Sequence, residues 1–151
     1  MASDQPPETA SEPTAEPGCI FCEIVAGDLP AEIIDSDEHT VTLMDINPAT
    51  KGHALVIPRR HSDDLLDIGE DDLTACAIAA QRVVKRMEAS LEPDGFNLIN
   101  ATRAAAWQTV FHFHIHVVPR YEDDPLKLPW IPRGADLDEI ATIAATIREG
   151  R

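Results

Sequence analysis

The sequence predicts an α+β domain whose strands form a mostly antiparallel sheet. Short apolar segments cluster around two amphipathic helices, without the regular strand–helix alternation that builds a parallel sheet. A chain of 151 residues with 44% hydrophobic residues is long enough for a single domain with its own core. Three cysteines, an odd number, give no disulfide framework.

The acidic composition narrows the classes of partner. Lysine and arginine total 12 against 27 acidic residues, which gives a net charge of -15. Such a charge repels phosphate backbones and anionic lipids, so we expect neither nucleic acid nor a membrane surface as a partner. The chain has no apolar stretch of ~18 residues, and its start lacks the basic and apolar parts of a secretory signal. Together with the cysteine count, these features favour a cytoplasmic protein.

The first 17 residues differ in composition from the rest of the chain. They contain four prolines and four acidic residues, no basic residue and almost nothing to bury. Such a segment cannot offset the entropy lost on ordering. We therefore expect residues 1–17 to be a disordered acidic tail, and residues 18–151 to form a single domain with a C-terminal extension.

Apolar patterning places the first elements. Residues 19–25 are typical of a short helix that ends at Gly27. Residues 31–34 and 41–46 predict a pair of strands with an acidic turn between them. A third strand over residues 54–57 is stopped by a proline.

The second half begins with a longer helix. From residue 73 to residue 91, apolar positions recur every three or four residues, and Cys76 lies on that buried face. Strands are predicted over residues 96–100 and 109–118. Residues 136–148 then predict a final short helix with apolar residues on one side.

Alternating histidines in the fifth strand carry the strongest chemical signal. Strand geometry sends His112, His114 and His116 to one face, with successive members ~6.6 Å apart. Such a row can be a zinc platform that needs a third ligand and an open position for water. Alternatively, its neutral imidazoles serve as a nucleophile and proton carriers. An uncharged ring nitrogen can approach an anionic phosphate without charge repulsion and form a phosphoramidate that water later cleaves.

Two further features suit chemistry at a phosphate. His53 and His61 stand at opposite ends of the third predicted strand. Asp45 ends the strand before it, where its carboxylate can accept hydrogen bonds from a sugar diol. Each has a surface explanation by itself, but together with the histidine row they form a pattern.

These motifs together resemble the histidine-triad (HIT) family. The resemblance covers residues 19–121 and is carried by the motifs Cys19-Ile20-Phe21-Cys22, Met44-Asp45-Ile46-Asn47-Pro48, residues 52–61, and Gln108-Thr109-Val110 before the triad. It implies a HIT-like fold with a five-stranded antiparallel sheet and two main helices. It also implies a homodimer that joins two such sheets into one of ten strands.

The resemblance further implies a nucleotide site. His114 corresponds to the nucleophile, His116 would contact the phosphate or leaving group, and His53 would help to orient the site. The residues implied around the base and ribose are Phe21, Ile24, Leu43, Asp45 and Ile46, with Asp45 holding the ribose hydroxyls. Those implied around the phosphate are Asn100, Gln108 and Thr109.

The cysteine pair points to a metal. Cys19-x-x-Cys22 alone fits a redox pair as well as a zinc site. In the cysteine-bearing branch of the resembled family, a structural zinc is held by this pair and two histidines, which match His61 and His112. The resemblance therefore implies a Cys₂His₂ zinc site, takes His112 out of catalysis and disfavours a thiol-redox role. It implies no organic cofactor.

The sequence departs from the family pattern near the phosphate. Trp107 stands where the family usually has glycine, and the loop from Asn100 to Gln108 is one residue longer than usual. Leu43 replaces an aromatic residue of the base pocket. A bulky indole there could narrow the cleft, so these changes leave the substrate open.

The resemblance implies a hydrolase that acts at the α-phosphorus of a purine nucleotide or nucleotide conjugate. Our leading expectation is cleavage of nucleoside 5′-phosphoramidates through a covalent nucleotidyl intermediate on His114, with release of a product like AMP. Hydrolysis of dinucleoside polyphosphates is the second reading, with the same nucleophile and a wider cleft. The third reading is a nucleotide-binding scaffold with vestigial activity, which the intact set of Asp45, His53, His114 and His116 disfavours.

Overall fold

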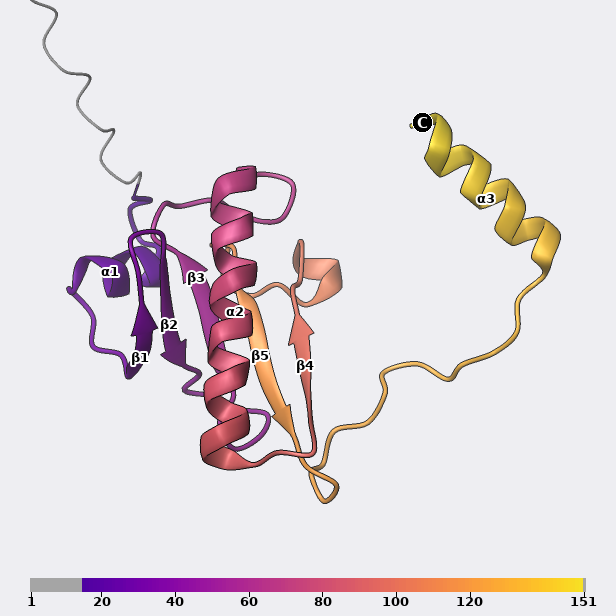
Figure 1. Cartoon of the computed structure of the whole chain (residues 1–151). Helices are drawn as coiled ribbons and strands as arrows, with labels where there is room; N and C mark the ends of the chain where they lie inside the picture. Colours follow the sequence, from indigo (N-terminus) through magenta and orange to yellow (C-terminus); the bar gives the residue numbers. More distant parts are fainter. Residues whose placement is uncertain (1–14, 151) are drawn as a thin grey trace, which may run out of the picture.

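The computed structural model of the chain describes residues 15–150 (Figure 1). The predicted tail over residues 1–17 lies outside the described residues except for its last three positions, so it stays a prediction. In chain order the elements are α1 (Ile20–Ala26), β1 (Ile33–Ser36), β2 (Thr40–Met44), β3 (Ala54–Pro58), α2 (Glu70–Leu91), β4 (Gly95–Ile99), the short 3₁₀ turn η1 (Ala104–Ala106), β5 (Ile115–Arg120) and α3 (Leu137–Glu149).

The strands form one five-stranded sheet in the order β1-β2-β3-β5-β4. Every neighbouring pair is antiparallel, which confirms the α+β class and the antiparallel sheet. Strand β5 lies between β3 and β4 in the sheet, and α2 connects β3 to β4 along the chain. Figure 1 shows α2 lying along one face of the sheet, while α3 stands away from the domain beyond β4.

Each face of the sheet has its own apolar cluster. Alternate residues of the strands pack against α2, where Val56, Val83 and Val117 are buried. The other residues of β2 and β3 pack around Phe21 of α1 on the opposite face. Because strand side chains alternate, the histidines that share a face with Leu55 lie on the α1 side.

The fifth strand is shorter than the sequence predicts. It begins at Ile115 rather than residue 109, because the third strand cannot extend the ladder. Pro58 ends β3 and has no N–H to donate, and its carbonyl accepts a hydrogen bond from the His112 ring instead. Phe111, which alternation would place in the core, is 54% exposed.

Other boundaries shift by a few residues. The first strand occupies residues 33–36 rather than 31–34, and the second ends at Met44. The long helix starts at Glu70, three residues before its apolar pattern, because acidic side chains stabilise a first turn. Asp72 in that turn accepts both bonds of a bidentate pair from Arg60, at 3.0 Å each, and anchors the helix start to the end of β3.

Within residues 15–150, every helix is too short or too polar to traverse a lipid bilayer.

A buried hydroxyl under α2 gives a test of the packing. Thr42 is fully buried on β2, and its Oγ1 has no hydrogen-bond partner among residues 15–150. Burying such a group costs free energy that a methyl group of the same shape avoids. We expect Thr42→Val to raise the free energy of unfolding by about 1 kcal/mol in urea denaturation. Val41→Thr, on the opposite face of the same strand, should lower it; a loss of stability in Thr42→Val would contradict this reading.

Candidate active site and metal centre

Four side chains from three separate segments converge beside the start of α1. Cys19 Sγ lies 3.4 Å from His112 Nδ1, and Cys22 Sγ lies 3.6 Å from the same nitrogen. Cys22 Sγ is also 3.4 Å from His61 Nδ1. All four candidate ligand atoms lie within 4.8 Å of one another.

These separations fit a tetrahedral zinc ion. Zinc bonds of ~2.3 Å to sulfur and ~2.1 Å to nitrogen place neighbouring S and N ligands ~3.6 Å apart. The outer ring nitrogens are also paired: His112 Nε2 donates to the carbonyl of Pro58 at 2.9 Å, and His61 Nε2 faces Asp63 Oδ1 at 2.8 Å. Such partners orient metal-bound imidazoles and leave Nδ1 free as the ligand. The Cys19, Cys22, His61 and His112 set therefore suits a structural zinc.

Local sequence explains why the two thiols face one point. Cys19 is the N-cap of α1, and its sulfur accepts a hydrogen bond from the backbone N–H of Cys22. A cap and the third residue of the following helix lie on the same side of the first turn. Burial raises the pKa of the Cys22 thiol, so a thiolate here needs a cation to hold its charge. By contrast, Cys76 is fully buried on the core-facing side of α2, as predicted for a core residue.

The middle histidine of the triad is held in one tautomer. His114 Nδ1 lies 2.8 Å from the backbone carbonyl of His112, which can only accept a hydrogen bond. Nδ1 therefore carries the ring proton, and Nε2 keeps its lone pair. The ring also packs edge-on against Phe21, with centroids 5.3 Å apart. His114 thus presents an unprotonated nitrogen while its ring is fixed on two sides.

The third histidine is held in the opposite tautomer. The backbone N–H of Ala49 donates to His53 Nδ1 at 2.9 Å, so the proton of a neutral His53 is on Nε2. His53 Nε2 is 2.9 Å from His116 Nδ1 and donates to it. His116 therefore carries its own proton on Nε2. The two hydrogen bonds form a relay that ends in a proton donor beside the His114 ring, whose centroid is 4.9 Å from that of His116.

Asp45 closes this group of polar side chains. Its Oδ2 lies 3.4 Å from His53 Nε2 and 4.0 Å from His116 Nδ1. The three atoms are close enough to surround a metal ion. The donor set does not fit one, because His53 accepts the Ala49 N–H on Nδ1 and so keeps its proton on Nε2. The arrangement suits hydrogen bonding and proton transfer.

Burial keeps the imidazoles neutral. It lowers the pKa of His114 and of His53, and it lowers the pKa of His116 to about 4, helped by the neighbouring His114 and His53. Neutral rings are the forms that the hydrogen-bond pattern requires.

A cavity of about 540 Å³ opens in front of His114 and His116. Phe21, Leu43 and Leu55 form its buried apolar part, and Ile46, 91% exposed, stands at its edge. The site residues predicted from the sequence that line the cavity are Phe21, Ile24, Leu43, Asp45, Ile46, Thr109, His114 and His116. A hydrophobic slot therefore ends at two imidazoles and a carboxylate.

Two residues expected near the phosphate are bonded to the backbone instead of lining this cavity. Asn100 Nδ2 donates to the carbonyl of His114 at 2.9 Å. Gln108 is buried; its Oε1 accepts from the N–H of Arg103 at 2.6 Å, and its Nε2 donates to the carbonyl of Asp63 at 2.7 Å. In this structure both amides position the loop around His114, and their expected contact with phosphate stays a prediction.

The unusual tryptophan lies on the surface. Trp107 adopts a left-handed backbone conformation, with a φ of 77°, which explains why a glycine suits this position. Its indole is 73% exposed and does not line the cavity.

Sequence reasoning missed part of the cavity wall. The loop after α1 contributes Leu29, Pro30 and Ala31, and Leu55 contributes from β3. Leu55 could have been found, because alternation places it on the same face as His53. The loop could not, because its place depends on the turn at Gly27, where the chain leaves α1 with a φ of 82°.

The metal centre predicts a zinc-dependent stability. Elemental analysis of the purified protein should find one zinc per chain, and Cys22→Ser should lose most of it. Because metal binding contributes to folding free energy, the melting temperature of the variant should fall by more than ~5 °C. Cys76→Ala removes a thiol from the core and should keep the zinc. Full zinc retention in Cys22→Ser would rule out this ligand set.

The lowered pKa values predict an acid-sensitive fold. A histidine titrates near pH 6.5 in an unfolded chain, and at about 4 for folded His116. Between these values the unfolded state binds more protons, so this contribution to stability is complete above about pH 6.5 and is lost as the pH falls toward about 4. NMR titration of the ring signals should give midpoints below 6.5 for His114 and His116. A midpoint at or above that value would contradict the buried, neutral rings.

Comparison with known proteins identifies similar chains. The HIT domain family matches residues 26–123. The Protein hit of Bacillus subtilis is 38% identical over 132 residues, covering 85% of this chain and 91% of its own. The span of the family match includes Asp45, His53 and the triad.

Solved structures show the same fold. A protein of Streptococcus mutans superposes with a TM-score of 0.86 at 32% identity, covering 90% of this chain and 87% of its own. A zinc-bound histidine triad family protein of Mycobacterium smegmatis is 37% identical, with a TM-score of 0.70 over 89% of this chain and 98% of its own. A histidine triad nucleotide-binding protein of Candida albicans is 26% identical, with a TM-score of 0.79 over 87% and 96% of the two chains.

Proposed function

Because this chain belongs to the HIT family, we propose that it is a nucleotide hydrolase that cleaves nucleoside 5′-phosphoramidates at the α-phosphorus. The observation that carries the proposal is the hydrogen bond from His114 Nδ1 to the carbonyl of His112, which leaves Nε2 as an unprotonated nucleophile. The similar Candida albicans protein is a nucleotide-binding one, which supports a nucleotide as the ligand.

The first chemical step forms a bond from His114 to phosphorus. The lone pair of His114 Nε2 attacks the α-phosphorus, and the bond between phosphorus and the amine nitrogen breaks with its electron pair on that nitrogen. His116 Nε2–H, at the end of the relay from Ala49, gives the leaving amine its proton as the bond breaks. The negative charge left on the His116 ring is balanced by the positive charge on the adjacent His114 ring, which keeps its Nδ1 proton when Nε2 bonds to phosphorus. The result is a nucleotidyl group bound covalently to His114.

Water completes the reaction. It attacks the same phosphorus and gives a proton to the now basic His116 Nε2. The bond from phosphorus to His114 breaks, and its electron pair returns to Nε2. The products are a nucleoside monophosphate and the free amine, and both histidines regain their starting tautomers.

The cavity suits one nucleoside. Its buried apolar part, around Phe21, Leu43 and Leu55, can hold a flat base. Asp45 lines the same cavity and lies 3.4 Å from His53 Nε2, where it can serve as a ligand for the ribose hydroxyls. A volume of about 540 Å³ has the size of a site for one small molecule. This size favours a mononucleotide conjugate over a dinucleoside polyphosphate.

Charge at the site supports an anionic substrate despite the acidic chain. The net charge of -15 repels phosphate in general. The histidines that face the phosphate are neutral because burial lowers their pKa values. A neutral nucleophile meets no direct charge repulsion from the phosphate.

The nucleophile gives the decisive test. We expect His114→Ala to lower the kcat for adenosine phosphoramidate by more than ~10³-fold. Nucleotide affinity, measured by calorimetry, should change by less than ~3-fold, because the cavity walls remain. His39→Ala removes an exposed histidine in the turn between β1 and β2. Its kcat and nucleotide affinity should match those of wild type.

Parallel substrates separate the alternatives. Faster release of AMP from diadenosine polyphosphate than from the phosphoramidate would favour the second enzyme reading. Wild-type protein that binds AMP but turns over neither substrate would favour the nucleotide-binding scaffold. Trapping of radiolabelled nucleotide on wild type, and its absence from His114→Ala, tests the covalent intermediate.

The implied homodimer also stays a prediction. Strand β4 is an edge of the sheet, and Leu98 and Ile99 on it are exposed. An exposed apolar edge of this kind is a surface on which a second sheet can pair.

A further inference from the structure

The C-terminal helix has an apolar side with nothing packed on it. Leu137, Ile140, Ile143 and Ile147 recur every three or four residues, so they form one stripe along α3. Each is at least 50% exposed, and no residue of the helix is buried. A lone helix of 13 residues is marginal in water. The stripe therefore needs a surface that covers it.

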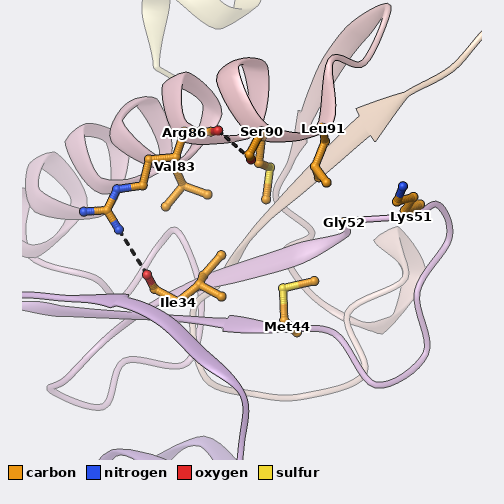
Figure 2. Close-up of a pocket in the computed structure, with 9 residues that line it drawn as sticks. Ile34, Met44, Lys51, Gly52, Val83, Arg86, Ser90 and Leu91 are labelled. Carbon is orange, nitrogen blue, oxygen red and sulfur yellow. Dashed lines mark hydrogen bonds between the residues drawn. The ribbon is translucent and has the colours of Figure 1, made fainter.

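A second apolar hollow lies under α2, on the other side of the sheet. A cavity of about 380 Å³ opens between the C-terminal half of α2 and strands β1 and β2. Figure 2 shows Val83 and Leu91 pointing into it from the helix, opposite Ile34 and Met44 from the strands. Apolar walls cannot hold ordered water well, so large aliphatic side chains are the occupants that such a space favours.

Charge at the rim of the cavity matches α3. Lys51 and Arg86 line it, and Lys85 lies on the adjoining surface of α2. Arg86 is paired with Asp35 of the same copy at 3.1 Å. Lys51 makes no ion pair within residues 15–150. The first turn of α3 carries Asp138 and Glu139. In a chain with a net charge of -15, basic side chains at the cavity match the acidic first turn of α3 in charge.

The course of the chain selects a second copy as the acceptor. The cavity opens on the β1–β2 side of α2, whereas the segment leading to α3 leaves on the β4 side and carries the helix outward (Figure 1). A second copy placed against the β4 edge would lie where α3 projects. The segment over residues 122–136, when extended, spans up to ~50 Å, which is enough to cross such a neighbour.

We propose that α3 of one copy docks, by its apolar stripe, in the cation-rimmed cavity between α2 and strands β1 and β2 of a second copy. Reciprocal exchange of the two helices would fill both cavities and cover both stripes. Asp138 and Glu139 would then face Lys51 and Arg86 of the other copy. This interface is separate from the histidine site, because it lies on the opposite face of the sheet.

Crosslinking between two different copies tests the contact. One copy carries Ser90→Cys at the cavity mouth, and the other, with a distinct tag, carries Ile143→Cys on the stripe. Mild oxidation should link the two copies at least ~10-fold more than the matched pair Ser90→Cys with Thr142→Cys, on the polar side of α3. Equal linking of both pairs would overturn the proposal. So would a disulfide that forms only within a single chain carrying both substitutions.

Measurements on folded variants and on wild type complete the test. Ile140→Asp with Ile143→Asp should weaken association at least ~100-fold in analytical ultracentrifugation, while Thr142→Asp should not. In wild type, hydrogen exchange should show protected α3 amides that lose protection on dilution. Amides of α3 that exchange freely at every concentration, or protection that is independent of concentration, would overturn docking on a second copy. The rate of adenosine phosphoramidate hydrolysis, measured on the same variants, reports on the histidine site. A failure of the proposed function is thus distinguished from a failure of the proposed interface.

Discussion

The structure depends most on the way in which a single buried residue, His112, is held. Its ring is fully buried and is fixed at both nitrogens, by the Pro58 carbonyl on one side and the thiol pair on the other. Its own carbonyl accepts the hydrogen bond from His114 Nδ1 that sets the tautomer of His114. The candidate metal centre, the end of β3 and the proposed nucleophile are thus joined through one residue. Through its backbone carbonyl, His112 decides which ring nitrogen of His114 carries the proton.

The loop that precedes the triad is tied to the same place. The side-chain carboxylate of Asp63 faces His61 Nε2, and its backbone carbonyl accepts a hydrogen bond from Gln108 Nε2. Gln108 in turn holds the N–H of Arg103, a residue with a positive φ of 72°. An unfavourable backbone conformation can persist where surrounding contacts determine it. The zinc ligands therefore support the active-site loop from a second direction.

Much of the fold could be predicted from the sequence, because apolar periodicity and turn residues are local signals. The prediction of a strand over residues 109–118 was wrong in its first half. The length of that strand depends on whether Pro58, on another strand, can donate a hydrogen bond. The metal ligands were implied by resemblance, and the structure brings all four together. The bonding of Gln108 could not be read from sequence, because its partners lie up to 45 residues away. What packs against α3 cannot be predicted from a local pattern either, because its partners are not its neighbours in sequence.

The proton relay leaves the side chain at position 49 free to vary. The relay begins at the main-chain N–H of Ala49, which every residue type except proline can supply. Position 49 can thus accept many side chains through evolution with the tautomers of His53 and His116 unchanged. Its neighbour has no such freedom, because the hydroxyl of Thr50 bonds to the carbonyl of Pro119 across the sheet. Adjacent positions in one turn are therefore subject to opposite constraints, and a variable residue at 49 is compatible with an unvarying mechanism.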